Sequence, residues 1–520
     1  MKSDVLIIGS GLAGVTAALI LAEKNLSVSL ITRSSDIEET NTRDAQGGII
    51  YHGAGDPRLL EKDIIKAGAG INNKTAVKIL AEEGPKAVKD ILIRNLKINF
   101  TKDKKNNFHL TQEAGHSTRR ILHVNDQTGL AIEKTFVKKL KTYSNIKVFT
   151  NHSLIDLLTL PYHLKNSLSY RKKTNCVGAY VLDNQHKKVE IFLAKKIVLA
   201  TGGIGQIYMR TCNAKVSRAD GLVAAYRAGA KLANVEYIQF HPTSFYHHSL
   251  SNFLITEALR GEGAKLKNQK GELFMKKYDK RGSLAPRDIV SQGIFQQMLD
   301  NNEDYVLLDA CSYISSQKIK KMFPHIYQTC KKYGVDITRE PIPVAPTAHY
   351  FCGGVKVDTF GRTGIDNLYA VGEVSCTGVH GANRLASTSL LECLLWGKRA
   401  GENINKTIKK EKIIDEQLIK SWRYTHKISK IDPALIQQDW FLIKSIMWNY
   451  VGIIRTEKRL QRAVDDLAHL DREIDFFYRD VFISDELIGL RNGVKAALII
   501  AQAALKNKKS LGCHFRKEII

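Results

Sequence analysis

The stretch DVLIIGSGLAGVTAALILA (4–22) decides the fold that this chain is expected to adopt. An apolar strand runs into a glycine-rich turn, a helix rich in alanine and leucine follows to about Asn25, and SVSLIT (27–32) forms a second strand. The first glycine allows a tight bend, the second lets the backbone approach a pyrophosphate, and the third lets helix and strand pack closely. These glycines are Gly9, Gly11 and Gly14. Because the helix N-terminus offers free N–H groups to phosphates, the stretch predicts a Rossmann-like, dinucleotide-binding unit.

Two later segments repeat the plan of a short apolar strand followed by glycine. They are KKIVLATGG (195–203) and DNLYAVGEV (366–374). Elements this far apart are typical of FAD-binding domains assembled from distant segments, with a second domain inserted between them. After the third segment, glycine becomes rare and apolar residues recur every three or four positions, which predicts helices. We therefore expect an α/β + α fold. The expected parts are a discontinuous Rossmann-like FAD-binding domain (1–234 and 350–405), an inserted α+β capping domain (235–349) and a C-terminal helical domain (406–520).

Bulk composition leaves the class of partner open. The 520 residues are 44% hydrophobic and 25% charged, which is ordinary for a globular protein. No apolar run reaches the roughly 20 residues that a membrane helix needs, and no signal-peptide cleavage pattern follows the first strand. Eight scattered cysteines without CxxC or zinc spacing predict structural thiols, no metal site and the cytoplasm. The net charge of +26 suits an anionic substrate; nucleic-acid binding is disfavoured, because no basic region interleaves with aromatic residues.

Further motifs connect these strands, and together they carry a resemblance. They are NTRDAQGG (41–48), QFHPT (239–243), TEALRGEG (256–263), LAPRD (284–288), HYFCGGV (349–355) and GANRLASTSLLE (381–392). With the glycine-rich elements, they resemble in content and order the flavoprotein family of succinate dehydrogenase, fumarate reductase and L-aspartate oxidase. The resemblance runs from residue 4 to about residue 400 and continues more weakly into the helical tail.

The resemblance implies how FAD is bound. Membrane-bound succinate dehydrogenases and fumarate reductases attach FAD covalently to a histidine, and the matching residue here is Asn41, which cannot form that bond. We therefore expect non-covalent FAD. Arg33 replaces the acidic residue that usually ends the second strand, as is common in the family. The implied cofactor contacts are Gly9, Ser10, Gly11, Leu12, Ala13, Gly14, Arg33, Asn41, Thr42, Arg43, Asp44, Ala45, Gln46, Gly47, Gly48, Asp220, Glu373, Ser389 and Leu390.

The resemblance also implies a dicarboxylate site. The matching substrate-binding residues are His241, Thr256, His349 and Arg384. Arginine offers a planar fork that fits a carboxylate, while histidine and threonine add directional donors. Arg287 matches the catalytic arginine of the family, with Glu257 and Arg260 at its proton-relay positions. Because the pKa of arginine lies above about 12, such a role requires a relay. The alternative is a purely structural ion pair between Arg287 and Asp288.

The polar stretch TQEAGHSTRR (111–120) allows two interpretations. Without apolar periodicity it could be a solvated loop, or it could be a patch for a zwitterion, with His116, Arg119 and Arg120 as cations for carboxylates and Glu113 as the partner of an ammonium. In the family, the L-aspartate oxidases carry a glutamate here that faces the amino group of the substrate. The resemblance therefore assigns Glu113 to substrate binding.

The implied activity is FAD-dependent oxidation of L-aspartate to iminoaspartate, with oxygen or fumarate as electron acceptor. This reaction is the first step of de novo NAD biosynthesis, in which iminoaspartate passes to quinolinate synthase, a possible functional partner. Two alternatives stay open from the sequence: a soluble fumarate reductase with non-covalent FAD, which would share every motif except the environment of Glu113, and a flavin-dependent nucleic-acid-binding protein, suggested only by the charge.

Overall fold

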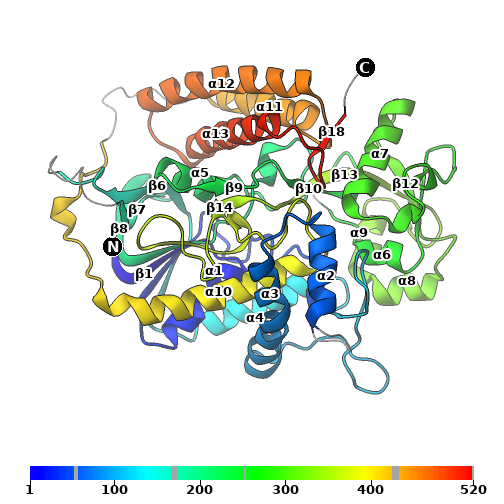
Figure 1. Cartoon of the computed structure of the whole chain (residues 1–520), viewed down its shortest axis with the longest axis horizontal. Coiled ribbons are helices and arrows are strands. Elements are labelled where there is room, and N and C mark those ends of the chain that lie inside the picture. The colour runs from blue at the N-terminus through cyan, green and yellow to red at the C-terminus, as the bar shows by residue number, and fades with distance from the viewer. Residues whose placement is uncertain (52–56, 166–173, 251–252, 424–431, 518–520) are drawn as a thin grey trace.

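The computed structural model describes residues 1–51, 57–165, 174–250, 253–423 and 432–517. A seven-stranded sheet lies at its centre, with helices above and below it, and a smaller α+β body stands at one end (Figure 1). The strands of the central sheet are β5 (Ile146–Phe149), β2 (Val28–Ile31), β1 (Lys2–Ile8), β8 (Lys188–Leu199), β7 (Asn175–Asp183) and β6 (His152–Leu160), in this order, with β15 (Leu368–Ala370) beside β8.

Strand β8 connects the parallel and antiparallel halves of this sheet. Its second half, from Leu193 to Leu199, pairs in parallel with β1, which in turn pairs in parallel with β2. On its other side, β8 pairs antiparallel with β7 over its first half and in parallel with β15 over its last three residues. The carboxyl ends of β1, β8 and β15 therefore meet at one edge, where dinucleotides bind in folds of this type.

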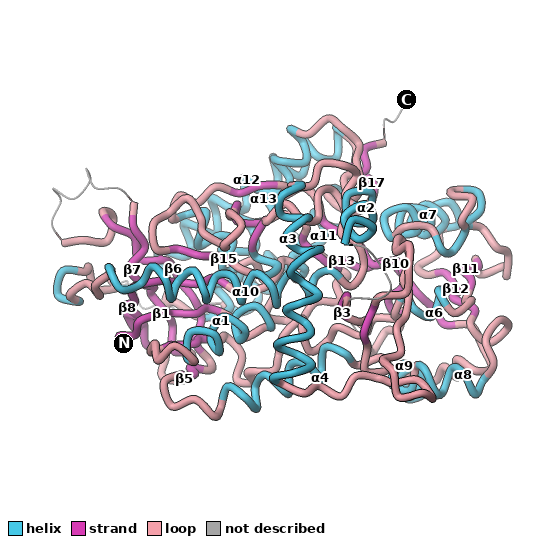
Figure 2. The backbone as a smooth tube through the Cα atoms, turned by 60° about the horizontal axis from the view of Figure 1, so that its bottom comes forward, coloured by secondary structure: helices cyan, strands magenta, loops and turns pink. Residues whose placement is uncertain are grey.

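Both faces of the central sheet are buried, and the sequence of β1 reflects this. Val5 and Ile7 point into one hydrophobic core and Leu6 and Ile8 into another. Uninterrupted apolar runs are typical of parallel strands covered on both sides. Figure 2 shows the helices of the first face. They are α1 (Leu12–Ala22), α3 (Lys74–Ala87), α4 (Thr128–Leu140) and α10 (Thr388–Thr407), with α2 (Pro57–Ala67) at the margin of the same core.

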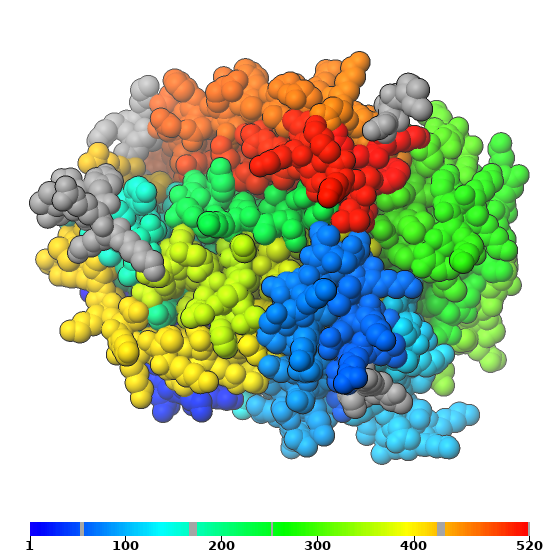
Figure 3. Space-filling model, in the orientation of Figure 1, coloured from blue at the N-terminus to red at the C-terminus, as the bar shows by residue number. Residues whose placement is uncertain are grey.

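The opposite face of the sheet is covered by one early helix and the C-terminal helices, which run along the top of the molecule (Figure 3). They are α5 (Asp220–Arg227), α11 (Pro433–Tyr450), α12 (Glu457–Asp480) and α13 (Asp485–Lys506). Although the sequence has no uninterrupted apolar run of this length, α13 is long and apolar enough to cross a membrane, but 72% of its apolar window is buried inside the protein. Its Arg491 ion-pairs with Asp156 at 3.4 Å. We interpret α13 as a core helix.

The smaller body is built on an antiparallel sheet with its own hydrophobic core. Its strands are β10 (Ile238–Phe245), β13 (Ile342–Phe351), β12 (Val306–Asp309) and β11 (Lys265–Lys267), and its helices are α6 (Glu257–Gly261), α7 (Arg287–Asn301), α8 (Ser316–Met322) and α9 (Pro324–Lys332). Strands β10 and β13 join the two bodies: Phe240 and Phe351 belong to the core under the central sheet, whereas Phe245 and Val344 belong to the core of the smaller body. We call this body the cap.

Short strands complete the structure. They are the pair β3 (Ile49–Ile50) and β4 (Ile121–Leu122), the three-stranded sheet of β9 (Leu232–Ala233), β14 (Gly354–Lys356) and β16 (Ser375–Cys376), and the pair β17 (Ile454–Arg455) and β18 (Phe515–Arg516). The predicted fold class, a Rossmann-like domain with an inserted α+β cap and a helical C-terminal part, is confirmed. Two element boundaries differ from the prediction: the first helix ends at Ala22 rather than near Asn25, and β8 already begins at Lys188.

Candidate active site

A cavity of about 470 Å³ lies between the central sheet and the cap. Its walls come from the segment 41–48, from the start of α10 and, on the other side, from β10, β13 and the N-termini of α6 and α7. A second cavity of about 110 Å³ follows the glycine-rich turn. Both are lined by Asn41, Thr42, Glu373 and Cys393, so the two cavities meet and form one elongated site.

The glycine-rich turn brings backbone segments of the protein into close contact. A Cβ atom at Gly9 would lie 2.1 Å from the carbonyl oxygen of Ala200, and one at Gly14 would lie 2.1 Å from the carbonyl oxygen of Gly9. Side chains are therefore excluded at both positions, as the sequence predicts. Residues 9–13 line the second cavity, whereas Gly14 does not and serves the packing of α1 on β1.

Two predicted cofactor contacts of the second cavity are also anchored to α13. Arg33 donates from Nε to both oxygens of Asp485 at 2.9 Å. Asp220 begins α5, pairs with Arg218 at 3.1 Å and accepts a hydrogen bond from Asn492 at 2.8 Å. The C-terminal helix thus fixes side chains of the dinucleotide cavity, which the sequence alone did not indicate.

Asn41 lies at the junction of the two cavities with its polar atoms engaged. Its Nδ2 donates to Glu373 at 3.2 Å, and its Oδ1 accepts from the backbone N–H of Ala214 at 2.8 Å and from the hydroxyl of Ser217 at 3.2 Å. Burial raises the pKa of Glu373 to about 7, although the N–H of Phe351 and the amide of Asn41 stabilise its charged form. An amide held in this way has no nucleophilic nitrogen, so FAD is bound without a covalent bond at this position.

The segment 41–48 and the start of α10 line the first cavity, including the predicted contacts Ser389 and Leu390. The two glycines of the segment are required by different neighbours. A Cβ atom at Gly47 would lie 2.9 Å from Oε1 of Glu113, whereas one at Gly48 would collide with the carbonyl oxygen of Leu122 on β4 at 2.2 Å. Gly48 lines the cavity, as expected for an implied cofactor contact, and is in addition required by strand packing.

His241 presents a free donor to the first cavity. Its Nδ1 accepts a hydrogen bond from the N–H of Thr243 at 3.2 Å, so the proton of the neutral ring lies on Nε2. Burial lowers the pKa of His241 well below its usual value, and the charge of Arg287 adds to this. The buried Nε2 has no hydrogen-bond partner in the described part of the chain, so it can donate to a ligand oxygen.

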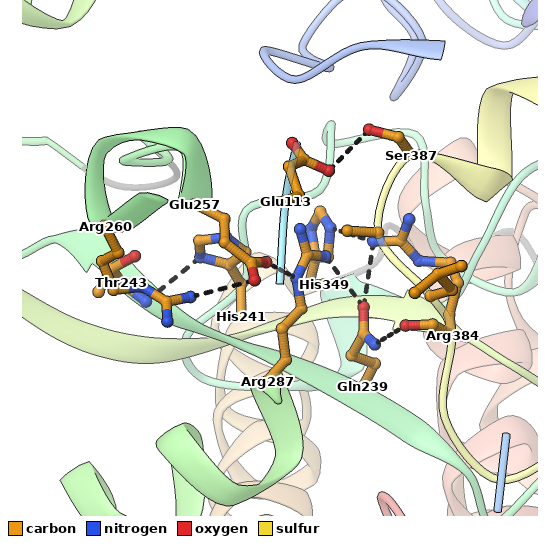
Figure 4. A network of polar contacts seen from close by, with 12 residues as sticks. Glu113, Gln239, His241, Thr243, Glu257, Arg260, Arg287, His349, Arg384 and Ser387 are labelled. Atoms are coloured by element: carbon orange, nitrogen blue, oxygen red, sulfur yellow. Dashed lines mark hydrogen bonds and ion pairs between the residues drawn. The ribbon is translucent and has the colours of Figure 1, made fainter. Parts of the chain in front are cut away.

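His349 and Arg384 contact each other across the cavity (Figure 4). Nη2 of Arg384 lies 2.9 Å from Nε2 of His349, and since a guanidinium only donates, Nε2 is the acceptor. Burial and the charge of Arg384 lower the pKa of His349 well below its usual value. The proton of the neutral ring is then on Nδ1, 3.0 Å from Sγ of Cys212. Thr256, the residue before α6, also lines the cavity.

Arg287 forms an ion pair with Glu257 and not with Asp288. Its Nε lies 2.5 Å from Oε2 of Glu257, and both residues line the cavity. Arg260 lies 3.7 Å from the other oxygen of Glu257, donates to the carbonyl oxygen of Ser283 at 2.6 Å and is fully enclosed. Burial raises the pKa of Glu257, but Arg287 and Arg260 outweigh it and hold the pKa below its ordinary value. Arg260 does not line the cavity and is connected to it by its ion pair with Glu257.

Glu113 lies in the same cavity on the wall that the central body supplies, beside Gly47 and Ser387, and we call this part of the cavity the Glu113 end. It accepts one hydrogen bond, from the hydroxyl of Ser387 at 2.7 Å, and no described cation lies within ion-pair distance of it. Burial raises its pKa, and the charge of Glu257 raises it further. The residue is buried at 6% exposure, so the interpretation as a solvated loop is wrong for this position.

The remaining polar residues of the stretch 111–120 do not reach the first cavity. Arg120 forms a buried ion pair with Asp63 at 2.7 Å, and His116 bonds the carbonyl oxygen of Ala386 at 3.0 Å. The idea that His116, Arg119 and Arg120 bind substrate carboxylates is therefore wrong, because the loop turns their side chains elsewhere. The buried positive charges of the cavity come instead from Arg287 and Arg384, while the third arginine of its lining, Arg43, is partly exposed and pairs with Asp36 and Asp44.

Sequence reasoning missed two residues that hold these groups in place. Gln239 contacts Arg287 and Arg384, and Ser387 contacts Glu113. Both lie inside motifs that were singled out, QFHPT and GANRLASTSLLE, but their partners are distant in sequence. Among its charged groups, the completed cavity offers the guanidiniums of Arg287 and Arg384 and a histidine donor for carboxylates, and the carboxylate of Glu113 for a cation. This set of charges fits a small molecule with two carboxylates and an ammonium.

Comparisons with known proteins agree with this geometry. A family model described as "FAD binding domain" matches residues 4–390, and one described as "Fumarate reductase flavoprotein C-term" matches residues 442–520. An L-aspartate oxidase of Yersinia pestis is 42% identical over 517 residues, covering 99% of this chain and 95% of that protein. A chloroplastic L-aspartate oxidase of Arabidopsis thaliana is 36% identical over 540 residues, covering 98% of this chain and 80% of that protein.

Solved structures give the same assignment of the fold. A quinol fumarate reductase of E. coli matches with a TM-score of 0.88 at 26% identity, covering all of this chain and 91% of that one. A Mycobacterium smegmatis Sdh1 structure matches with a TM-score of 0.80 at 28% identity, covering 99% of this chain and 89% of that one.

Proposed function

The chain belongs to the flavoprotein family of L-aspartate oxidase, succinate dehydrogenase and fumarate reductase, and we propose that it oxidises L-aspartate to iminoaspartate. It is a flavin-dependent oxidoreductase with non-covalent FAD. The observation that carries the proposed substrate is the buried Glu113, which accepts from a hydroxyl and has no ion-pair partner among the residues that the structure describes. Succinate and fumarate have no ammonium, so such a carboxylate would oppose their binding.

We assign the two carboxylates of L-aspartate to the end of the cavity where Arg287 of the cap and Arg384 of the central body lie. Arg384 and Arg287 supply the positive charges, and the free Nε2–H of His241 supplies a directional donor. The ammonium then lies at the other end, where it donates a charge-assisted hydrogen bond to Glu113. Contacts at both ends fix which face and which hydrogen of the α-carbon are presented to the cofactor.

The two joined cavities fit FAD in the parts that this chain supplies. The turn at Gly9–Ala13 would hold the pyrophosphate, and Asn41–Gly48 with Ser389 and Leu390 would hold the flavin ring next to the substrate. When bound, FAD supplies the redox chemistry, because it takes up the two electrons and the hydrogen that leave the amino acid.

Oxygen or fumarate is the proposed electron acceptor. For fumarate, a proton must be delivered to a carbon atom, and we assign this step to Arg287. Arginine alone is a poor acid because its pKa lies above about 12. The ion pair with Glu257 at 2.5 Å gives it a proton partner, and Arg260 stabilises the charge of Glu257 from behind. Arg260 is thus assigned a supporting role in the relay.

The place of the reaction in metabolism follows from the proposed product. Iminoaspartate is an unstable imine that water hydrolyses, so an enzyme that consumes it directly is expected. We propose the first step of de novo NAD biosynthesis, in the cytoplasm, with quinolinate synthase as the functional partner and no role for nucleic acid.

Substrate choice under air tests the proposal. The purified protein, reconstituted with FAD, is expected to release hydrogen peroxide with L-aspartate and not with succinate. The reverse pattern would identify a soluble fumarate reductase or succinate oxidase instead. Fumarate reduction alone, without activity on L-aspartate, would lead to the same correction.

A further inference from the structure

We infer that Gln239 is a positioning residue that holds the two active-site guanidiniums in one fixed arrangement. This inference rests on the proposed function. Oε1 of Gln239 accepts a hydrogen bond from Nη1 of Arg287 at 3.1 Å and from Nη2 of Arg384 at 3.0 Å. The two arginines come from different bodies, since Arg287 begins α7 of the cap and Arg384 precedes α10. One side-chain oxygen thus connects both halves of the carboxylate-binding end (Figure 4).

The orientation of this amide is determined by its neighbours. The guanidiniums can only donate, so the atom facing them must be the carbonyl oxygen. On the other side, Nε2 donates to the backbone carbonyl oxygen of Arg384 at 2.8 Å, which can only accept. A second bond from Nε2, to Oδ1 of Asn383 at 2.6 Å, completes the hydrogen bonding of Gln239. Every polar atom of the side chain has a partner, and the residue is fully buried.

A neutral acceptor suits this position for an electrostatic reason. Burial and the charge of Arg287 lower the pKa of Arg384, which reflects the repulsion between two buried cations. A carboxylate between them would relieve the repulsion, but it would also cancel positive charge that the substrate carboxylates need. An amide oxygen fixes both guanidiniums while leaving their charge available to the ligand.

Gln239 acts behind the arginines and not on the substrate. It lines neither of the two cavities of the elongated site, and its nearest polar neighbours are the two guanidiniums, Asn383 and a backbone carbonyl. Asn383 in turn accepts a hydrogen bond from the thiol of Cys513 at 3.2 Å, so the C-terminal tail supports the amide from the far side. The chain of contacts runs from the tail through Asn383 and Gln239 to both arginines.

The test compares variants of the FAD-loaded full-length enzyme by succinate binding, read from the flavin absorbance spectrum, and by turnover with L-aspartate. Gln239→Met has similar length and no acceptor, and we expect a loss of about 100-fold in kcat/KM and a similar loss in succinate affinity. The matched control is Gln297→Met, a buried glutamine on α7 outside the site, which should retain both values within about twofold. Succinate binding does not depend on aspartate turnover, so it tests this inference separately from the proposed function.

Two further variants separate positioning from folding. Gln239→Glu keeps an acceptor and should fold and bind FAD. Its negative charge should lower the affinity for succinate about tenfold, and it should lower the affinity for propionate, which has one carboxylate, clearly less. Asn383→Leu should lose part of the succinate affinity, and Asn383→Asp, which keeps an acceptor for Nε2, should restore it. Unchanged succinate affinity in Gln239→Glu, or equal losses for succinate and propionate, would overturn the inference. So would equal behaviour of the two Asn383 variants.

Discussion

The two ends of the cavity each contain one buried glutamate, and the pKa values of these glutamates are displaced in opposite directions. Glu257, at the cap end, lies between Arg287 and Arg260, which outweigh the effect of burial and lower its pKa. Glu113, at the other end, receives only the hydroxyl of Ser387, and burial raises its pKa. The same residue type, with nearly the same burial, is therefore prepared for two different tasks.

The difference shows which of the two carboxylates has its cationic partner within the protein and which one needs a cation from the ligand. A buried carboxylate needs compensation by charge or hydrogen bonds. Glu257 has its cations within the protein and can take part in proton transfer to Arg287. Glu113 is compensated only in part, so a ligand ammonium is the partner that completes it. We therefore expect the end with Glu113 to determine substrate specificity and the end with Glu257 to take part in the chemical step.

Removal of Arg287 should have the largest effect, because it takes away a carboxylate contact of every substrate and the assigned proton donor to fumarate. For Arg287→Leu we expect kcat to fall by about 10³-fold or more, in L-aspartate oxidation and in fumarate reduction alike. Steady-state kinetics of both reactions measure this. Arg339→Leu, at a side chain that is 85% exposed, is the control and should leave both rates unchanged. A loss confined to one reaction would contradict the assignment.

Replacement of Glu113 should affect only one reaction. Glu113→Gln keeps the shape but removes the negative charge, so kcat/KM for L-aspartate should fall by roughly 10- to 100-fold, the value of one charge-assisted hydrogen bond. Fumarate reduction should change by less than about threefold. The exposed Glu473→Gln serves as control. Equal losses in both reactions would remove the distinction between the two ends.

The pH dependence of binding should have opposite signs for the two ligand types. Protonated Glu113 loses the negative charge that pairs with an ammonium, so KM for L-aspartate should rise up to about tenfold per pH unit below the pKa of Glu113, which lies above its ordinary value of 4.5. Succinate should bind better over the same fall in pH, because the repulsion disappears. His241 and His349, whose pKa values are well lowered, should contribute nothing near neutrality. Measuring both constants from pH 5 to 8 decides the matter; parallel curves would contradict it.

The smallest expected effect concerns a hydrogen bond between the central body and the cap. Asp126, before α4, accepts a hydrogen bond at 2.9 Å from the N–H of Ile326 in the first turn of α9 in the cap. Asp126→Ala should raise KM for L-aspartate by about fivefold, as expected for a lost helix-terminal acceptor, with kcat less affected. Asp126→Asn retains an acceptor and should lose less. An unchanged KM in both variants would show that this contact does not hold the cap.

Residues that are required by contacts within a short stretch of sequence could be predicted from the sequence. Gly9 and Gly14 are required by contacts within the strand–turn–helix unit or directly beneath it, and the motif alone indicated them. Glu113 was assigned to substrate binding through the resemblance; the structure buries it in the cavity without an ion-pair partner among the described residues, and its role in binding stays a prediction. The fold class followed from periodicity and glycine spacing in the same way.

Residues whose role depends on contacts with residues far away in the sequence could not be predicted. The bonds of Gln239 to the guanidiniums span 48 and 145 residues, and nothing near it in the sequence specifies them. Arg120 appeared equivalent to a substrate-binding cation until the structure placed it beside Asp63, 57 residues away. Arg260 matched a relay motif, but only the fold revealed that it is enclosed behind Glu257.

The most direct test of the central claim is a structure of the slow variant Arg287→Leu with FAD and saturating L-aspartate, determined without oxygen. The account predicts that the ligand nitrogen lies about 2.7–3.0 Å from a carboxylate oxygen of Glu113, with a carboxylate of the ligand on Arg384. A ligand whose nitrogen points away from Glu113, or a Glu113 that contacts only Ser387, would contradict it.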